Sequence, residues 1–266
     1  MATHLRFRGY DVAATRRFAA TQPGASNFQG HVTHHHPAPE SNRLLQALPA
    51  AEQEHFIGAC VEVQFERGQV LYEAGDALLH VHFPTSTYVS IVSAVEGRTE
   101  LRAAMIGNEG AFGYELAFDV DCAPHQVQVQ GAGKAWRMTA QILKVELAAS
   151  PTLRRLLNRY LCLLLTQSVR MGACSYLHLL EARLAHWLLS MQDRAGSPRL
   201  VLTHEALAGM LGVRRAGITN ASAALVMRNL IGSHRGIITI VDRPGLKAVA
   251  CGCYQANRLV YETMAG

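Results

Sequence analysis

The stretch "LTHEALAGMLGVRRAGITNASAAL" at residues 202–225 decides the fold of the C-terminal part of this chain. Thr203 is a good N-cap for a short helix that continues to Met210. Two helices that cross at a tight turn bring their backbones close together, so the residue at the crossing must be small, as Ala208 is. Gly212 follows four residues later and permits a left-handed or close-packed turn that a side chain would hinder. The stretch therefore predicts two crossing helices.

The second helix of this pair begins with Arg214 and Arg215, beside the positive end of its own dipole. This position is unfavourable for folding, but it suits contact with phosphates or with guanine edges in a major groove. The spacing alone also fits an ordinary helical hairpin. The segment "NLIGSHRGIITIVD" at 229–242 predicts a short β-hairpin with Arg235 at its tip, where it can meet a backbone phosphate. A helix-turn-helix followed by such a wing predicts a winged helix that binds double-stranded DNA.

In the N-terminal half of the chain, the apolar residues do not follow the helical spacing seen at residues 202–225. Short runs rich in Val, Ile, Phe and Tyr recur about every ten residues and are separated by glycines. These runs are VEVQF, QVLYEAG, HVHFP, YVSIVS, TELRAAMIG and HQVQVQ. Their spacing predicts an antiparallel sandwich or barrel over residues 42–140, which a short helix at 42–55 precedes.

A long helix is predicted to begin at Ser150, which can cap it, and Pro151, which suits its first turn. Residues on one face recur at steps of three and four: Leu153, Leu156, Leu157, Tyr160, Leu161, Leu164, Ser168 and Met171. We expect the same helix of a second subunit to cover this face. The alternative is a core helix packed on its own β domain. A second helix at 179–194 ends at "AGSP", where we expect a hinge.

The composition is that of a folded protein, because 49% of the 266 residues are hydrophobic and 17% are charged. The formal net charge of +5 is compatible with a polyanionic partner without establishing one. The six cysteines form no CxxC pair, which favours a reduced cytoplasm. Cys251-x-Cys253 is interpreted as two buried thiols, not as a metal or redox pair. We expect no membrane span and no signal peptide.

The order β-roll, long helix, hinge helix and winged helix-turn-helix resembles the Crp/Fnr family of bacterial transcription regulators over residues 42–254. The motif "LAGMLGVRRAGIT…LIGSHRGIITIVDRPGL" carries the resemblance, and "CGCY" at 251–254 is similar to the ending of one subgroup. The expected fold class is α+β, with an N-terminal antiparallel, jelly-roll-like β-roll, a long dimerisation helix and a C-terminal winged helix-turn-helix. The expected domains are a flexible extension at 1–41, a cyclic-nucleotide-binding-like sensor at 42–149, the dimerisation helix and hinge at 150–195, and the DNA-binding domain at 196–266.

The resemblance implies a cytoplasmic homodimer that is not an enzyme, that binds a palindromic operator and that contacts RNA polymerase. It places base contacts on Arg215, Ala216 and Asn220, of which Arg215 can bind a guanine and Asn220 an adenine. The best-known member has an acidic residue and an arginine at the last two positions, so we expect a different operator. The full expected set of DNA-binding residues is Thr203, Arg214, Arg215, Gly217, Thr219, Asn220 and Arg235.

The segment "GNEGAFGYELAF" at 107–118 resembles the family's phosphate-binding cassette, whose glycines let backbone N–H groups reach an anion. Nucleotide-binding members follow it with an arginine, whereas this chain has His125 and then Gln126. A neutral histidine does not replace a fixed guanidinium at pH 7. A cyclic nucleotide, another small anionic effector and no effector at all therefore stay open. The candidate effector residues are Gly107, Glu109, Gly110, Gly113, Glu115, His125, Gln126 and Ser168.

Two other classes of function compete with this interpretation. A cupin-like β-barrel metalloenzyme could use His80 and His82, which share a strand face, and His125 as a third ligand. It lacks the expected carboxylate after His82, however, and it leaves the winged helix unexplained. A nucleotide-binding module that regulates a protein partner would bind ligand but no DNA. No residue is assigned as a metal ligand.

Overall fold

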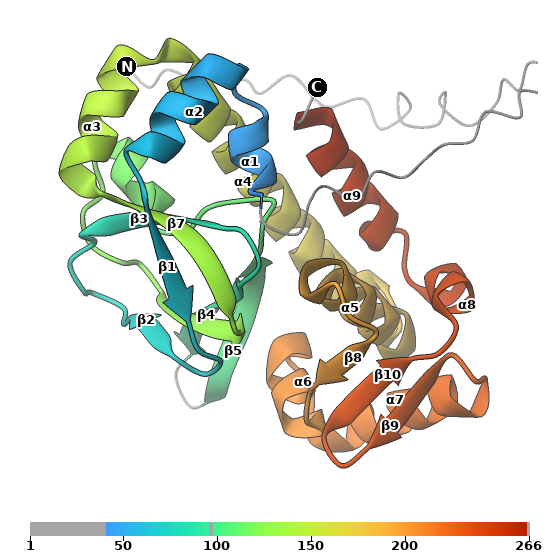
Figure 1. The fold of residues 1–266 in the computed structure, drawn as a ribbon. Coiled ribbons are helices and arrows are strands. Elements are labelled where there is room, and N and C mark those ends of the chain that lie inside the picture. Colours follow the sequence, from blue (N-terminus) through green and yellow to red (C-terminus); the bar gives the residue numbers. More distant parts are fainter. Residues whose placement is uncertain (1–40, 96–97, 265–266) are drawn as a thin grey trace, which may run out of the picture. The chain divides into compact units, whose positions relative to one another are not determined.

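The computed structural model describes residues 41–95 and 98–264, so the expected extension at 1–41 lies outside the described residues except for Ser41. Two short helices, α1 (Arg43–Gln46) and α2 (Ala50–Gly58), precede the first strand (Figure 1). Pro49 separates them, which divides the single helix expected at 42–55. The Asn42 side chain caps α1 and donates hydrogen bonds to the carbonyl oxygens of Pro84 and Gly110 at 2.9 and 2.8 Å. This buried amide therefore fixes one end of the cassette.

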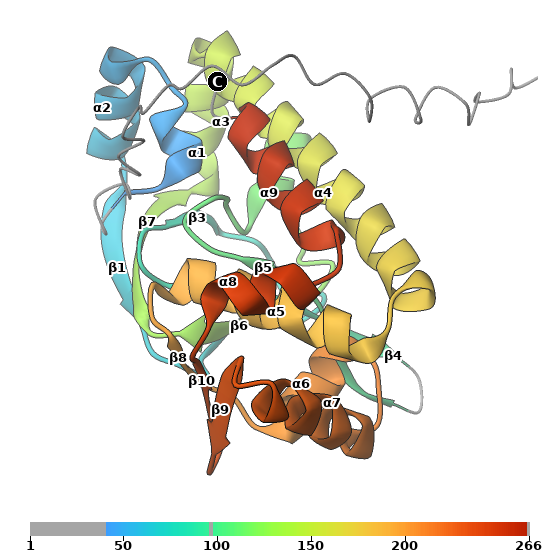
Figure 2. The same ribbon diagram turned by 90° about the vertical axis from the view of Figure 1, so that its right-hand side faces the viewer.

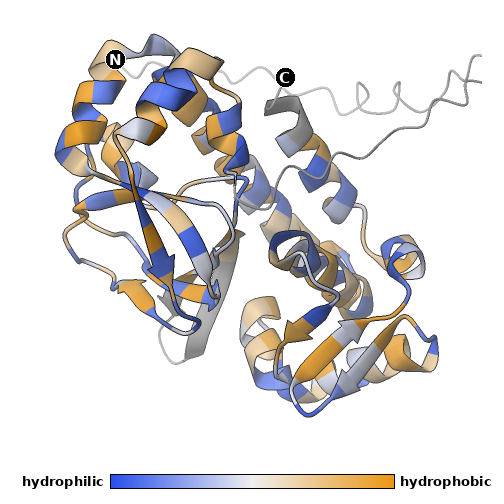
Figure 3. Ribbon diagram, in the orientation of Figure 1, coloured by the Kyte–Doolittle hydropathy of each residue, from blue (hydrophilic) through white to orange (hydrophobic). Residues whose placement is uncertain are grey.

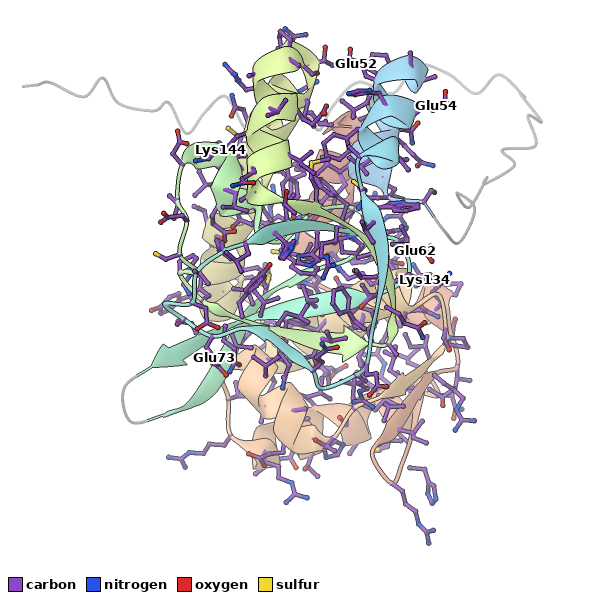
Figure 4. The ribbon with its side chains drawn as sticks, turned by 60° about the vertical axis from the view of Figure 1, so that its left-hand side comes forward. Glu52, Glu54, Glu62, Glu73, Lys134 and Lys144 are labelled. Atoms are coloured by element: carbon purple, nitrogen blue, oxygen red, sulfur yellow. The ribbon has the colours of Figure 1, made fainter. Side chains whose placement is uncertain are left out.

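Two antiparallel sheets form the β-roll. One contains β1 (Val61–Phe65), β7 (Gly133–Thr139) and β3 (His80–Pro84), in the order β1-β7-β3. The other contains β2 (Val70–Tyr72), β6 (Gln126–Gly131), β4 (Tyr88–Val95) and β5 (Arg98–Ile106), in the order β2-β6-β4-β5. The six predicted runs all become strands, but the central β7 is missed by the sequence analysis because Lys134 and Arg137 interrupt its apolar pattern. Lys134 forms an ion pair of 2.8 Å with Glu62 of β1 (Figure 4).

The cassette follows β5 and ends in a short 3-10 helix, η2 (Tyr114–Phe118). Gly113 precedes η2 with a φ of 74°, and a Cβ atom at this position would overlap the backbone oxygen of His80. Glycine is therefore required here by both backbone conformation and space. After η2 the chain forms β6 and β7 and then enters α3 (Ala140–Ala149). The side chain of Thr139 caps the N-terminus of α3.

The long helix α4 (Pro151–Leu177) begins as predicted, since Ser150 Oγ accepts a hydrogen bond from Leu153 N at 2.9 Å. It continues through Gly172. The face that was expected to pair with a second subunit lies against the chain's own cores instead. The residues of that face that pack there are Leu153, Leu156, Leu157, Tyr160, Leu164 and Met171. That part of the expectation is wrong, and the alternative of a helix packed on its own β domain is correct for this face.

Helix α4 has a second apolar stripe that the sequence analysis did not single out. Its members are Cys162, Leu165, Val169, Gly172 and Tyr176, which recur at alternating steps of three and four. Leu165, Val169 and Tyr176 are 59%, 75% and 92% exposed in the single chain. Figure 3 shows the helices in patches of orange and blue, as expected when different faces meet core and solvent. Both stripes recur at the same helical spacing, so spacing alone could not show which of the two faces the core.

The C-terminal part is built around a second core, to which Tyr88 of β4 and Met105 of β5 also contribute. Its elements are α5 (Leu180–Ala195), β8 (Arg199–Val201), α6 (His204–Leu211), α7 (Arg215–Met227), β9 (Ile231–His234), β10 (Ile237–Ile240) and α8 (Arg243–Val249). The three strands form an antiparallel sheet in the order β8-β10-β9. Helix α5, which we grouped with the dimerisation helix, contributes Leu184 and Leu188 to this core beside Leu207, Ile218 and Leu225. The second core thus begins before residue 196.

The last helix, α9 (Cys253–Met264), runs alongside α4 (Figure 2). Arg170 Nη1 donates a hydrogen bond to Asn257 Oδ1 at 2.6 Å, and Tyr261 Oη donates one to Gln167 Oε1 at 3.1 Å. This helix was not predicted from the sequence. Among the described residues, no helix is both long enough and apolar enough to span a bilayer.

Replacing Gly212 by alanine tests the predicted turn. Gly212 has a φ of 64°, so we expect Gly212→Ala to lower the free energy of unfolding by about 1 kcal/mol. Gly58→Ala is the matched control, because a Cβ there meets no atom within 4 Å and lies in the last turn of a helix. The control should leave stability unchanged or raise it slightly. Urea unfolding followed by circular dichroism measures both, and equal effects would contradict the assignment.

Candidate DNA interface and effector cassette

The crossing of α6 and α7 confirms the roles predicted for Thr203, Ala208 and Gly212. Thr203 Oγ1 accepts a hydrogen bond from Ala206 N at 3.1 Å and caps α6. Ala208 is buried in the core that it shares with Ile218 and Leu225 of α7. The backbone oxygen of Ala208 accepts hydrogen bonds from the N–H groups of Gly212 and Val213, which closes α6 with a left-handed C-cap. The turn is therefore set by local hydrogen bonds as well as by side-chain size.

Helix α7 divides cleanly into a buried and an exposed side. Ile218, Ala221 and Leu225 are buried in the C-terminal core. The residues exposed on the other side are Arg215, Ala216, Thr219, Asn220 and Ala223. The first turn contains no acidic residue. The N-terminal end of α7 thus combines the positive end of the helix dipole with exposed arginines, which favours contact with anions.

Two other predicted DNA contacts, Arg214 and Gly217, are not part of this exposed side of α7. Arg214 is the exposed N-cap residue of α7 and makes no side-chain capping bond, so its guanidinium is not used in closing the helix. Gly217 faces Leu180, whose Cδ2 atom would lie 3.1 Å from a Cβ atom at this position. Gly217 therefore permits close packing of α7 against the start of α5, and its contact with DNA stays a prediction.

The wing is the hairpin of β9 and β10. Arg235 and Gly236 form its two-residue turn, with φ angles of 44° and 77°. Positive φ at both central residues is the pattern of a type I′ turn, which matches the twist of the flanking strands. Arg235 is exposed at the tip. The hairpin and α7 lie at the same end of the C-terminal part (Figures 1 and 2), so their arginines can act on one surface.

The cassette carries one buried ion pair. Glu109 is 8% exposed, and its Oε1 atom lies 2.6 Å from Nη2 and 2.8 Å from Nε of Arg194, near the end of α5. Arg194 also donates hydrogen bonds to the carbonyl oxygens of Met105 and Ser190 at 3.3 and 2.9 Å. This arginine therefore connects the cassette to the helix that supports the winged helix.

The other candidate effector residues have diverse surroundings. Gly110 has no room for a side chain, because Tyr160 of α4 fills the space and its hydroxyl donates a hydrogen bond to Ala111 O at 3.1 Å. Ser168 is exposed and donates to Leu164 O within α4, and His125 is exposed beside Gln126. Glu115 Oε2 and Gln126 Oε1 are buried and meet no hydrogen-bond donor in the part of the chain that the structure describes.

The three histidines of the rival metalloenzyme do not converge. His82 stacks on Phe112 with ring centroids 4.6 Å apart, and burial lowers its pKa to about 3. His80 lies on the same strand, whereas His125 is not part of any group of metal ligands among the described residues. The described group whose ligand atoms do lie close together comprises Cys174, His178, Cys251 and Cys253.

Breaking the buried ion pair should be costly. We expect Arg194→Ala to lower the free energy of unfolding by about 3–5 kcal/mol, because Glu109 would keep its charge in a buried position without a counterion. Arg228→Ala removes the more exposed pair with Glu181 and should cost about 1 kcal/mol or less. Urea unfolding of both variants makes the comparison, and a loss in Arg194→Ala no larger than in the control would contradict this role.

Comparison with known proteins agrees with the fold and with a helix-turn-helix in the C-terminal part. Residues 182–249 match the Crp-like helix-turn-helix domain, whereas no curated protein matches the sequence. FixK2 from Bradyrhizobium japonicum superposes with a TM-score of 0.62 at 15% identity, over 73% of this chain and 98% of that one.

Two further solved structures have the same fold. The c-di-GMP-responsive global regulator CLP of Xanthomonas campestris gives a TM-score of 0.60 at 15% identity, over 72% of this chain and 99% of its own. A CRP-family transcriptional regulator from Thermus thermophilus gives 0.61 at 16% identity, over 71% and 96%. The chain therefore carries a Crp-like helix-turn-helix domain within the fold of the Crp/Fnr transcription regulators, which confirms the family resemblance that the sequence indicated.

Proposed function

We propose that this protein is a homodimeric, sequence-specific DNA-binding transcription regulator of the bacterial cytoplasm. The observation that carries this proposal is the exposed side of α7, which opens with two arginines and continues with Thr219 and Asn220. An α-helix fits the major groove, and its N-terminal residues reach base edges when it enters as the second helix of a helix-turn-helix. Arg235 at the wing tip is a cation on the same surface and suits a phosphate.

The individual side chains suit different parts of the duplex. Arg215 can donate two hydrogen bonds to the O6 and N7 atoms of a guanine, and Asn220 can bind an adenine through its amide. Ala216 between them offers only a methyl group, which suits contact with a thymine methyl. Thr203 and Arg214 lie near the start of their helices, where contact with phosphate fixes the register of the protein on DNA.

The second apolar stripe of α4 supports dimerisation. Its alternating steps of three and four are those of the a and d positions of a coiled coil, and exposed Leu, Val and Tyr side chains along such a seam favour pairing with an identical helix. A two-fold dimer presents two copies of α7. Half-sites about 34 Å apart along one side of DNA would match them, which requires a palindromic operator.

The cassette is the proposed site of a small effector. Glu115 and Gln126 each leave one buried oxygen without a donor among the described residues. Burial and then the charge of Glu115 raise the pKa of Tyr72, and Tyr72 pairs with Val127, next to Gln126. Two acceptors in this setting suit amino or hydroxyl groups of a ligand, such as those of a nucleotide. CLP is described as responsive to c-di-GMP, which makes that dinucleotide the first compound to test.

The effector would act by changing the relative populations of two arrangements of the protein, which differ in the position of α5. Glu109 belongs to the cassette and Arg194 to the helix beneath the winged helix, so a ligand that competes for Glu109 favours a different position of α5. Binding then changes the relative affinity of the two arrangements for DNA, and by reciprocity DNA changes the affinity for the ligand.

The function is tested by selecting bound duplexes from a randomised DNA library with purified full-length protein, without and then with c-di-GMP and cyclic AMP. We expect enrichment of a palindrome with half-sites centred about ten base pairs apart. Enrichment only with a nucleotide would show that the effector is required. No enrichment under any condition would contradict sequence-specific binding and favour a module that acts on a protein partner.

Two arginine variants distinguish base from phosphate contacts on the selected site. Arg215→Ala should cost about 1–3 kcal/mol of binding free energy and relax the preference at one base pair of each half-site. Arg235→Ala should weaken binding to all sequences alike and make the dependence on salt shallower. Fluorescence anisotropy at several salt concentrations, on cognate and scrambled duplexes, measures both. A uniform loss for Arg215→Ala, or an unchanged salt slope for Arg235→Ala, would reverse the assigned role.

A further inference from the structure

Three cysteines and one histidine converge where the end of α4 meets the start of α9. Cys174 is in the last turn of α4 and His178 is its C-cap residue. Cys251 lies between α8 and α9, and Cys253 is the first residue of α9. Their sulfur and nitrogen ligand atoms all lie within 4.8 Å of one another, and the three cysteines are buried. The two halves of this cluster are brought together from positions 77 residues apart.

Three of the six separations between ligand atoms in the cluster are close to those of a tetrahedral site. Cys174 Sγ lies 3.6 Å from Cys251 Sγ, and His178 Nδ1 lies 3.4 and 3.7 Å from the sulfur atoms of Cys174 and Cys253. In a tetrahedral zinc site, bonds of about 2.3 Å to sulfur and 2.0–2.1 Å to nitrogen place two sulfurs about 3.8 Å apart and sulfur and nitrogen about 3.5 Å apart. The cysteines are free thiols, since a disulfide requires about 2.05 Å between sulfurs.

The surroundings of the cluster suit a structural ion. Ala182 packs against the three cysteines, and its carbonyl oxygen accepts a hydrogen bond from Cys251 N at 3.3 Å. His186 is buried, and its Nδ1 atom lies 3.6 Å from Cys251 Sγ. An N–H group there can donate to a coordinated thiolate, as the outer partners of metal ligands commonly do.

We propose that Cys174, His178, Cys251 and Cys253 bind one zinc ion that joins the C-terminal end of α4 to the start of α9. Four protein ligands of this kind close the coordination sphere, so the ion is structural and holds no substrate. The ion closes a loop that contains α5 and the whole winged helix. It thereby fixes the base of the DNA-binding domain to the helix that carries the proposed dimer interface. This site is independent of the proposed effector cassette.

Metal content tests the proposal directly. Untagged full-length protein, produced with zinc in the medium and purified under reducing conditions, should contain about one zinc ion per chain by plasma mass spectrometry. Cys251→Ser should lose that ion. Cys162→Ser is the matched control, because Cys162 lies on the same long helix as Cys174 but is exposed and outside the cluster. The control should retain the metal. The histidines at 34–36 are unchanged in every variant, so metal bound there cancels from the comparison.

A spectroscopic measurement on the unmodified chain guards against a variant that fails to fold. Protein reconstituted with Co²⁺ should show the intense visible bands of tetrahedral cobalt and thiolate charge-transfer bands in the near ultraviolet. One equivalent of Zn²⁺ should remove both sets of bands. Absence of charge-transfer bands, or equal zinc content in the wild-type protein and Cys251→Ser, would overturn the proposal. Neither readout depends on DNA binding, so failure of this site and failure of the proposed function are distinguishable.

Discussion

The packing of α4 on several surfaces at once is the constraint on which the rest of the structure depends. Leu153, Leu157 and Tyr160 fix its first half in the core of the β-roll. Farther along, Gln167 and Arg170 hold α9 by hydrogen bonds. The remaining side carries exposed apolar residues at coiled-coil spacing. Each surface uses a different set of helical positions, so one helix can connect the β-roll, the C-terminal helix and, as we propose, a second subunit.

The winged helix meets this framework through its supporting helix α5 and through the contact of α6 with β5. Helix α5 shares a core with α6, α7 and α8, which makes it part of the support of the exposed side of α7. The ion pair of Arg194 with Glu109 joins the end of α5 to the cassette. Near the beginning of α5, Ala182 packs against Cys174, Cys251 and Cys253, and its carbonyl oxygen accepts a hydrogen bond from Cys251 N.

Local sequence signals predicted the parts of the fold that depend on local physics. The cap at Thr203, the left-handed turn at Gly212 and the hairpin around Arg235 were all identified, because each requires a particular residue type at one position. The exposed positions on α7 followed from the same helical spacing. The sequence also indicated the β-roll, although the polar residues of β7 hid one of its central strands.

Contacts between distant segments were not predictable in this way. Two apolar stripes on α4 have the same period, and only the packing shows that the leucine-rich one is internal. The sequence around Glu109 does not indicate that its ion-pair partner is Arg194, which lies 85 residues away. Cys251 and Cys253 were interpreted as buried thiols, which their burial bears out, but their partners come from the end of α4. The spacing Cys174-x-x-x-His178 on a helix was the signal that could have suggested them.

Cross-linking through a native cysteine tests the central claim, which is that the exposed stripe of α4 joins two subunits. Cys162 is an exposed member of that stripe, so in a two-fold dimer it lies close to Cys162 of the partner subunit. Mild oxidation of the full-length protein should give a covalent dimer on a non-reducing gel. The dimer should vanish in Cys162→Ser and persist when the exposed Cys122 is replaced by serine. A covalent dimer that needs Cys122 instead, or a protein that stays monomeric, would contradict the account.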